Sequence, residues 1–431
     1  MACVVVCKEG AASDWGDSFS NWLDLKASLM QQIQYSDNMV LNPTQPKAAF
    51  GYILNPSLEA NHQTESSFIT LKAQGNIKRY DNSLFNCENY GVTLNSQYKT
   101  QRSVFKLTGT YGNACAYSQQ AQETGVIIPG VQSTTYNIDP SWTWQWTPRD
   151  QLSLDAMYRS MSYSGGGSSG SANLTKNGSS PNGYTNFDTY TINLGLNHVW
   201  DRYVTLTGGV YFMNSQYMGT NPSTQQSLGF QLGGNYLINQ QWSANFSAGL
   251  RRTEIQSNSL LSSSASNTSS MSPLGNFSVN YKGSLSTFSA VYSNTIMPSA
   301  LGQTLQLQSI TTKYSYQIYQ HLSFDINTIL LDSQPIGGQS TKGSTTTSNS
   351  REAFTNIMEF VWEFSRNWQL KGSYMYRWQK YQQQNPAESN TIMLSVSYSL
   401  DDIQDTDTSR YNLFDNRSSY GGTIEKLGQW F

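Results

Sequence analysis

The chain has 431 residues; 37% of them are hydrophobic, 13% are aromatic and only 13% are charged, and the net charge is −2. The charged share is about half that of an average soluble protein, and the near-zero net charge excludes a strongly basic surface for nucleic acid. No apolar run approaches the roughly 20 residues of a membrane-spanning helix, so strands are the remaining way to cross a membrane.

The N-terminal residues resemble a secretory signal peptide only in part. The apolar stretch Ala2–Cys7 is shorter than the roughly 7–15 residues of a signal core, whereas Gly10-Ala11-Ala12-Ser13 resembles its small-residue end. A truncated signal peptide and a genuine mature N-terminus are both open interpretations. In either case residues 1–19 form a separate N-terminal segment.

Alternating apolar and polar side chains begin at Leu23 and continue to Leu400. In the clearest stretch, Phe360 to Trp378, the even positions are mostly aromatic and the odd positions mostly polar, with a break at 365–367. A period of two predicts β-strands with one apolar and one polar face. The pattern predicts eighteen strands, at 23–35, 50–60, 69–77, 90–98, 105–111, 136–146, 152–160, 190–200, 204–212, 228–238, 244–250, 275–281, 288–292, 305–311, 322–330, 354–364, 368–378 and 392–400.

The connections between these strands are of two kinds. After every second strand the link is tight, as at 147–150, 200–203, 239–242, 319–322 and 365–368. The intervening links are long and polar, as at 112–134, 163–186, 253–274 and 332–353. Short periplasmic turns and long extracellular loops are typical of bacterial outer-membrane barrels. We therefore predict an all-β fold, a transmembrane antiparallel β-barrel of about 18 strands (roughly 16–20), spanning residues 20–400 in the bacterial outer membrane.

Aromatic residues gather near the tight turns. A soluble core would concentrate bulky side chains at strand middles, whereas amphipathic rings at strand ends match the interfacial girdle of a membrane barrel. The predicted lipid-girdle aromatics are Trp142, Trp144, Trp146, Trp200, Tyr203, Trp242, Phe364 and Trp368.

If the aromatic parity faces lipid, the polar parity lines the lumen. Both signs of charge occur there, so no single-sign ring for selecting ions is predicted. Amides and hydroxyls such as Gln74, Asn95 and Asn193 stand between the charges and suit either water or sugar hydroxyls. The predicted charged lining residues are Asp24, Lys26, Lys72, Lys106, Asp155, Arg159, Arg251, Asp325, Glu359, Glu363, Lys371 and Arg377.

Cys87 and Cys115 are predicted to form a disulfide. They end the fourth and fifth strands on the loop side, and the hairpin brings them nearly opposite each other. Strict alternation puts them on opposite faces, so a kink near Gly112-Asn113 is needed. An oxidising periplasm favours the bond, which would hold the root of the 112–134 loop.

The sequence offers no motif for catalysis. The three histidines, His62, His198 and His321, fall near the turn-side rim and lack a Ser and acid in a hydrolase pattern. No phosphate loop, zinc spacing or haem-attachment pair occurs. We therefore expect no enzymatic activity, no metal and no cofactor.

Two segments are candidates for filling the lumen. Gly125-Val-Ile-Ile-Pro-Gly130 is an apolar stretch inside a polar loop; it either folds inward as a constriction or packs on a neighbouring subunit. The tail, 401–431, begins DDIQDTD and breaks the alternation. It either hangs in the periplasm, plugs the lumen or docks a periplasmic partner.

The stretch Tyr35-Ser-Asp-Asn-Met-Val-Leu-Asn-Pro43 resembles the opening Tyr-x-Asp-Asn-hydrophobic-x-x-x-Pro of the porin-like outer-membrane barrels associated with exosortase and exopolysaccharide gene clusters. This resemblance implies an outer-membrane component for polysaccharide export. The stretch enters the first long loop, and Asp37-Asn38 is also a turn signal that any barrel loop could use.

These observations predict a porin-like channel that passes hydrophilic, saccharide-like solutes. A general diffusion porin and a plugged scaffold that docks another envelope protein are the alternatives. The expected partners are outer-membrane lipid and lipopolysaccharide, a small hydrophilic or glycan solute, and no nucleic acid; a monomer and a trimer fit equally.

Overall fold

The computed structural model describes residues 23–400 apart from 117–124, 126–128, 166–183, 219–221, 258–265, 337–349 and 382–384. The predicted N-terminal segment, 1–19, and the tail, 401–431, therefore lie outside the described residues.

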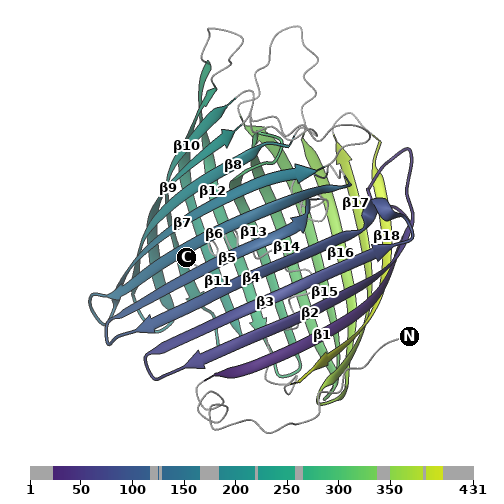
Figure 1. Ribbon diagram of the computed structural model, residues 1–431. Coiled ribbons are helices and arrows are strands. Elements are labelled where there is room, and N and C mark those ends of the chain that lie inside the picture. Colours follow the sequence, from purple (N-terminus) through teal and green to yellow (C-terminus); the bar gives the residue numbers. More distant parts are fainter. Residues whose placement is uncertain are drawn as a thin grey trace, which may run out of the picture.

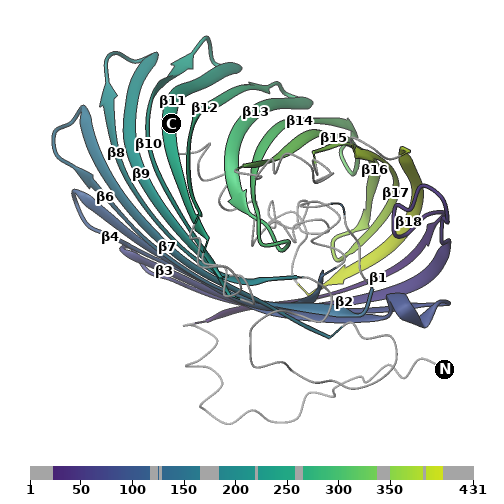
Figure 2. The same cartoon turned by 90° about the horizontal axis from the view of Figure 1, so that it is seen from above.

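Eighteen antiparallel strands form one closed sheet, which confirms the predicted fold. Each strand pairs with the next along the chain, and β18 pairs with β1, with Tyr35 opposite Ile392. Figures 1 and 2 show the barrel from the side and from above. The strands are β1 (Asp24–Ser36), β2 (Ala49–Gln63), β3 (Ser67–Tyr80), β4 (Cys87–Lys99), β5 (Ser103–Cys115), β6 (Val131–Gln145), β7 (Asp150–Gly165), β8 (Asn186–Val199), β9 (Val204–Met218), β10 (Ser223–Leu237), β11 (Trp242–Ser257), β12 (Ser266–Lys282), β13 (Ser286–Pro298), β14 (Thr304–Tyr319), β15 (Leu322–Ile336), β16 (Arg351–Ser365), β17 (Trp368–Tyr381) and β18 (Ala387–Ser399).

A short 3-10 helix, η1 (Ser83–Phe85), precedes β4. Its first turn is capped by Asn82, whose side-chain oxygen accepts a hydrogen bond from the backbone N–H of Leu84 at 3.2 Å. Within the described ranges, no helix is long and apolar enough to cross a membrane.

Large apolar side chains lie on the outer face of the barrel. On β10, Leu228 and Leu232 are 62% and 64% exposed, whereas Gln231 between them is 7% exposed. The same alternation recurs in most strands, because successive side chains of a strand point to opposite faces. An exposed apolar band of this extent belongs in lipid. The strand positions that carry the aromatic residues therefore face outward.

Outward-facing charged residues mark the loop-side limit of this band. Arg79 on β3 forms an ion pair with Glu88 on β4, and Arg252 on β11 pairs with Glu254 at 2.7 Å. Because a charge facing hydrocarbon is costly, the lipid must end below these residues. The strands themselves continue past this limit.

The predicted loop boundaries were therefore wrong at the loop side. Strands β5, β7, β11 and β15 run to residues 115, 165, 257 and 336, so the loops expected to begin at 112, 163, 253 and 332 are shorter. Beyond the lipid both faces of a strand meet water, so the alternation fades while the backbone ladder continues. The loop side is also less uniform than expected, since β13 and β14 are joined by 299–303 alone.

Candidate functional site

The inner wall of the barrel is the first part of the candidate site. The strand registers place every charged residue predicted to line the lumen on the inner face, opposite in parity to the exposed apolar side chains. Lys26 and Lys72 both stand beside Glu59 in the ladder. The positions between the charges carry mainly amides and hydroxyls, so the wall is polar with few net charges.

The charges of the inner wall are largely compensated on the turn side. Lys371 Nζ lies 2.9 Å from Glu359 Oε1, and both side chains are mostly buried. Asp325 stands opposite Glu359 in the register and accepts a hydrogen bond from the Ser315 hydroxyl. Lys26 and Asp24 form a more exposed pair at 3.6 Å. This part of the lumen is polar without a strong net field.

The predicted girdle aromatics lie at the turn-side end of the barrel. Trp146 and Trp200 are the most exposed, at 62% and 65%. Trp142 and Trp144 are half-buried because their rings stack in a column with Trp146 and Phe105, with interplanar angles of 10–19°. Tyr203, Trp242, Phe364 and Trp368 are also exposed on the outer face.

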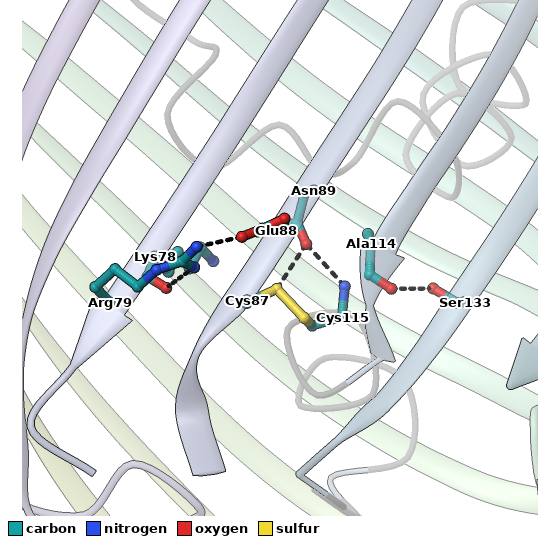
Figure 3. Close-up of a disulfide and its surroundings, with 8 residues drawn as sticks. All are labelled: Lys78, Arg79, Cys87, Glu88, Asn89, Ala114, Cys115 and Ser133. Atoms are coloured by element: carbon teal, nitrogen blue, oxygen red, sulfur yellow. Dashed lines mark hydrogen bonds and ion pairs between the residues drawn. A yellow bond between two sulfur atoms is a disulfide. The ribbon is translucent and has the colours of Figure 1, made fainter. Parts of the chain in front are cut away.

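Cys87 and Cys115 form a disulfide at the loop side, with their Cα atoms 6.1 Å apart (Figure 3). The pairing of β4 with β5 ends at Tyr90 opposite Asn113, so the last residues of β5 leave β4 and Cys115 can turn toward Cys87. Asn89 supports this turn by accepting a hydrogen bond from the backbone N–H of Cys115 at 2.8 Å. The separation of the strands supplies the kink that alternation requires.

The disulfide belongs to a buried apolar cluster at the root of the 116–130 connection. The other members are Met39, Ala49, Tyr80 and Phe85. Loop 37–48, the end of β3 and η1 therefore pack together at this point of the rim.

Replacing both cysteines by serine (C87S/C115S) should leave the barrel folded but lower its stability by about 2–4 kcal/mol, the range for a bond that closes a loop of this length. Urea unfolding followed by tryptophan fluorescence measures the change. Reducing the wild-type protein should reproduce it, and reduction should not affect the double variant. Equal stability of the oxidised and reduced wild-type protein would contradict a structural role.

A hairpin that separates from β12 and turns inward is the second part of the candidate site. β13 pairs with β12 only as far as Asn294, opposite Gly275, but stays paired with β14 to Pro298, opposite Thr304. On its other side β14 stays paired with β15 up to Thr304, opposite Ile336. Figure 2 shows the ends of β13 and β14 turned into the interior of the ring. Residues 293–300 are buried on both parities, unlike a strand of the wall. We call residues 293–307 the inner hairpin.

The inner hairpin docks on the inner wall at β8, β9 and β10. The backbone N–H of Thr185 donates to the carbonyl of Ala300 at 2.6 Å, and the Tyr217 hydroxyl donates to the carbonyl of Gln303 at 3.0 Å. The Thr304 hydroxyl donates to the side-chain oxygen of Gln225. These partners belong to the loop-side ends of β8, β9 and β10, so the hairpin narrows the loop-side mouth.

The sequence pattern did not predict the inner hairpin. Its sequence SNTIMPSALGQTLQL carries apolar residues on both parities, such as the adjacent Ile296 and Met297. Such a run cannot face lipid on one side and water on the other. This signal was present in the sequence, but only the packing shows where the hairpin goes.

The stretch Tyr35–Pro43 ties the first strand to the last. The Asp37 carboxylate accepts hydrogen bonds from the backbone N–H and the side-chain amide of Asn390, both at 2.7 Å. The Asn38 amide donates to the carbonyl of Glu388 at 2.9 Å. The Asp-Asn pair of the motif therefore fastens the β1–β18 seam at its loop-side end.

The loop that follows, 37–48, turns over the lumen. Leu41 is buried, takes the left-handed φ of 51°, and its carbonyl accepts a hydrogen bond from Gln379 Nε2 at 3.2 Å. The same amide lies 3.4 Å from the carbonyl of Gly125, and its oxygen accepts from Arg351 Nε at 3.1 Å. Of the two paths considered for the 125–130 segment, Gly125 takes the inward one, since its carbonyl meets Gln379; residues 126–128 lie outside the described residues.

These segments enclose a cavity of about 430 Å³ at the mouth. Its walls are formed by loop 37–48, the inner hairpin and the loop-side ends of β17 and β18. Amides, one lysine, one tyrosine and one serine supply the polar groups, and the described residues contain no cluster of metal-ligating side chains. The principal lining residues are Leu41, Asn42, Lys47, Leu301, Gln303, Gln379 and Tyr381.

Comparison with known proteins gives the fold alone. No family model matches the chain, and no curated protein matches its sequence. Among solved structures, the unliganded ferric citrate transporter FecA superposes with a TM-score of 0.52 at 10% identity, over 87% of this chain and 78% of that chain. The siderophore receptor PiuA from Acinetobacter baumannii gives 0.49 at 10% identity (86% and 81% covered), and Pseudomonas aeruginosa OccK2 gives 0.43 at 10% (88% and 98%).

The closed barrel, the apolar outer band and the superposition on FecA agree. The chain has the fold of a bacterial outer-membrane β-barrel, and its place is the outer membrane.

Proposed function

We propose that the protein is an outer-membrane channel for hydrophilic, saccharide-like solutes, with its mouth narrowed by the inner hairpin and loop 37–48. The polar inner wall carries this proposal. Among the buried polar side chains, hydroxyls and amides far outnumber charges, as at Asn137, Thr191, Gln231 and Ser247. Neutral donors and acceptors exchange hydrogen bonds with sugar hydroxyls as readily as with water.

The resemblance of Tyr35–Pro43 to exopolysaccharide-associated barrels supports a polymeric glycan as the solute. Its Asp37 and Asn38 hold the barrel seam, whereas its Leu41, Asn42 and Pro43 line the cavity at the mouth. An amide-rich cavity at the same mouth fits one end of a glycan chain.

The test is the current through the purified barrel in planar bilayers. Neutral oligosaccharides are expected to interrupt the current in a concentration-dependent way, because they form hydrogen bonds with the wall. Polyethylene glycol of the same hydrodynamic size should cause shorter interruptions. Equal interruption by both polymers would instead indicate a general diffusion porin.

The plugged scaffold remains the second candidate, and the docked inner hairpin favours it. A barrel that carries no current and does not admit sugars into swelling liposomes, although it is folded, would support the scaffold and exclude the channel.

A further inference from the structure

Arg251 is a buried cation on the inner face of β11. The side chain is 1% exposed, and its Nε–H donates to the Ser272 hydroxyl at 2.7 Å. Neither Nη1 nor Nη2 meets a hydrogen-bond partner among the residues that the structure describes. A buried guanidinium with its terminal edge unused is costly, so its presence in a neutral wall needs an explanation.

A glycine and a tyrosine lie beside the terminal Nη1 and Nη2 groups of Arg251. Gly229 is its partner on β10, and the Tyr211 ring lies across that glycine. A Cβ at Gly229 would come within 2.2 Å of the Tyr211 ring, so only glycine lets the ring lie there. The Tyr211 hydroxyl lies beside the guanidinium without meeting hydrogen-bond geometry, and like Nη1 and Nη2 it has no hydrogen-bond partner among the described residues.

The buried Lys371 of the lumen is held differently, because Glu359 lies 2.9 Å from its ammonium group. Around Arg251 the buried neighbours on the inner face are neutral: Ser227, Gln231 and Thr253. Within the described residues, no carboxylate forms an ion pair with Arg251.

Arg251 lies two inner-face positions along the β10–β11 pair from the docking point of the inner hairpin. Thr253, two residues along β11, shares a hydrogen bond with the Ser227 hydroxyl at 3.0 Å. That hydroxyl in turn accepts a hydrogen bond from Gln225 Nε2 at 3.4 Å. Gln225 is the residue on which Thr304 of the hairpin docks. The guanidinium therefore lies just below the constriction, at the level that a solute reaches after it has passed the hairpin.

We propose that Arg251, Tyr211 and Ser272 form a subsite for a carboxylate group on the solute. The transported saccharides are then acidic ones that carry uronate-type residues. This proposal rests on the proposed function. With Nε held by Ser272, the parallel N–H groups of Nη1 and Nη2 match the two oxygens of a carboxylate. The neutral side chains nearby suit the sugar hydroxyls.

The test is isothermal titration of the detergent-solubilised full-length protein with digalacturonate and, separately, with uncharged maltose. Arg251→Gln should weaken digalacturonate binding by about tenfold or more, and Tyr211→Phe by roughly two- to tenfold. Arg252→Gln is the matched control. It removes the same charge from the next residue of β11, which faces outward and pairs with Glu254, and it should change the affinity by less than about twofold. A difference in electrophoretic migration between the unheated and the heated protein verifies folding of each variant.

Equal binding of digalacturonate by the wild type and Arg251→Gln, or equal binding of digalacturonate and maltose by the wild type, would overturn the subsite. Inorganic phosphate that competes as strongly as the uronate would show that the site takes phosphate rather than carboxylate. Because binding is measured without current, loss of the subsite leaves the channel proposal standing. A barrel that binds digalacturonate but never conducts contradicts the channel alone.

Discussion

Replacing residues 296–306 by an Asn-Gly turn is expected to raise the single-channel conductance severalfold. Thr295 and Leu307 are direct cross-strand partners, so a two-residue turn can join them without disturbing the ladder below. The change removes the part of the inner hairpin that docks on Tyr217 and Gln225. A barrel of this strand number is wide enough for an aqueous channel once nothing crosses it.

The control for this shortening is a turn at the other rim. Exchanging 239–241, the tight link between β10 and β11, for Gly-Ser-Gly should leave the conductance unchanged, since that link crosses no part of the mouth. If the shortened hairpin conducts no better than the wild type, the constriction lies elsewhere. Urea unfolding of both variants shows whether the barrel itself is intact.

Lys371→Gln is expected to destabilise the barrel by about 3–5 kcal/mol, because it leaves the largely buried Glu359 without its cation. The loss of stability is larger because Asp325, a second carboxylate, stands opposite Glu359 in the ladder. In bilayers the same variant should shift the reversal potential toward cation selectivity, since two neighbouring carboxylates then face the lumen.

Lys26→Gln is the matched control for charge loss. Its ion pair with Asp24 spans 3.6 Å and is much more exposed, so its removal should cost less than about 1 kcal/mol. The charge swap K371E/E359K should recover most of the stability lost in Lys371→Gln. An equal effect of the two lysine variants would show that the Lys371 pair is solvated like a surface pair.

The wall of the barrel could be predicted from the sequence because it follows local rules. A side-chain period of two gives each strand and its two faces, and tight turns order the strands. The position of Phe364 and Trp368 on either side of a tight turn already implied the outward face. The disulfide also followed from a hairpin register together with one kink.

The contents of the lumen could not be predicted in the same way. The inner hairpin is held by contacts between distant residues, such as Thr304 with Gln225, which no local pattern encodes. The pattern of alternation placed Arg251 and Lys371 in one group of lining residues. Lys371 has a carboxylate partner, whereas Arg251 has none within the described chain. Burial and partners, rather than residue type, separate them.

The departure of β13 from β12 also determines where the barrel is weakest. Above Gly275 the backbone of β12, residues 266–274, has a ladder partner on β11 only, whereas the β1–β18 seam is paired up to Ser36 and fastened beyond it by Asp37. Backbone amides with fewer ladder partners open and exchange their hydrogens sooner. The sheet should therefore unzip first between two strands in the middle of the chain, while the junction of its two ends stays closed.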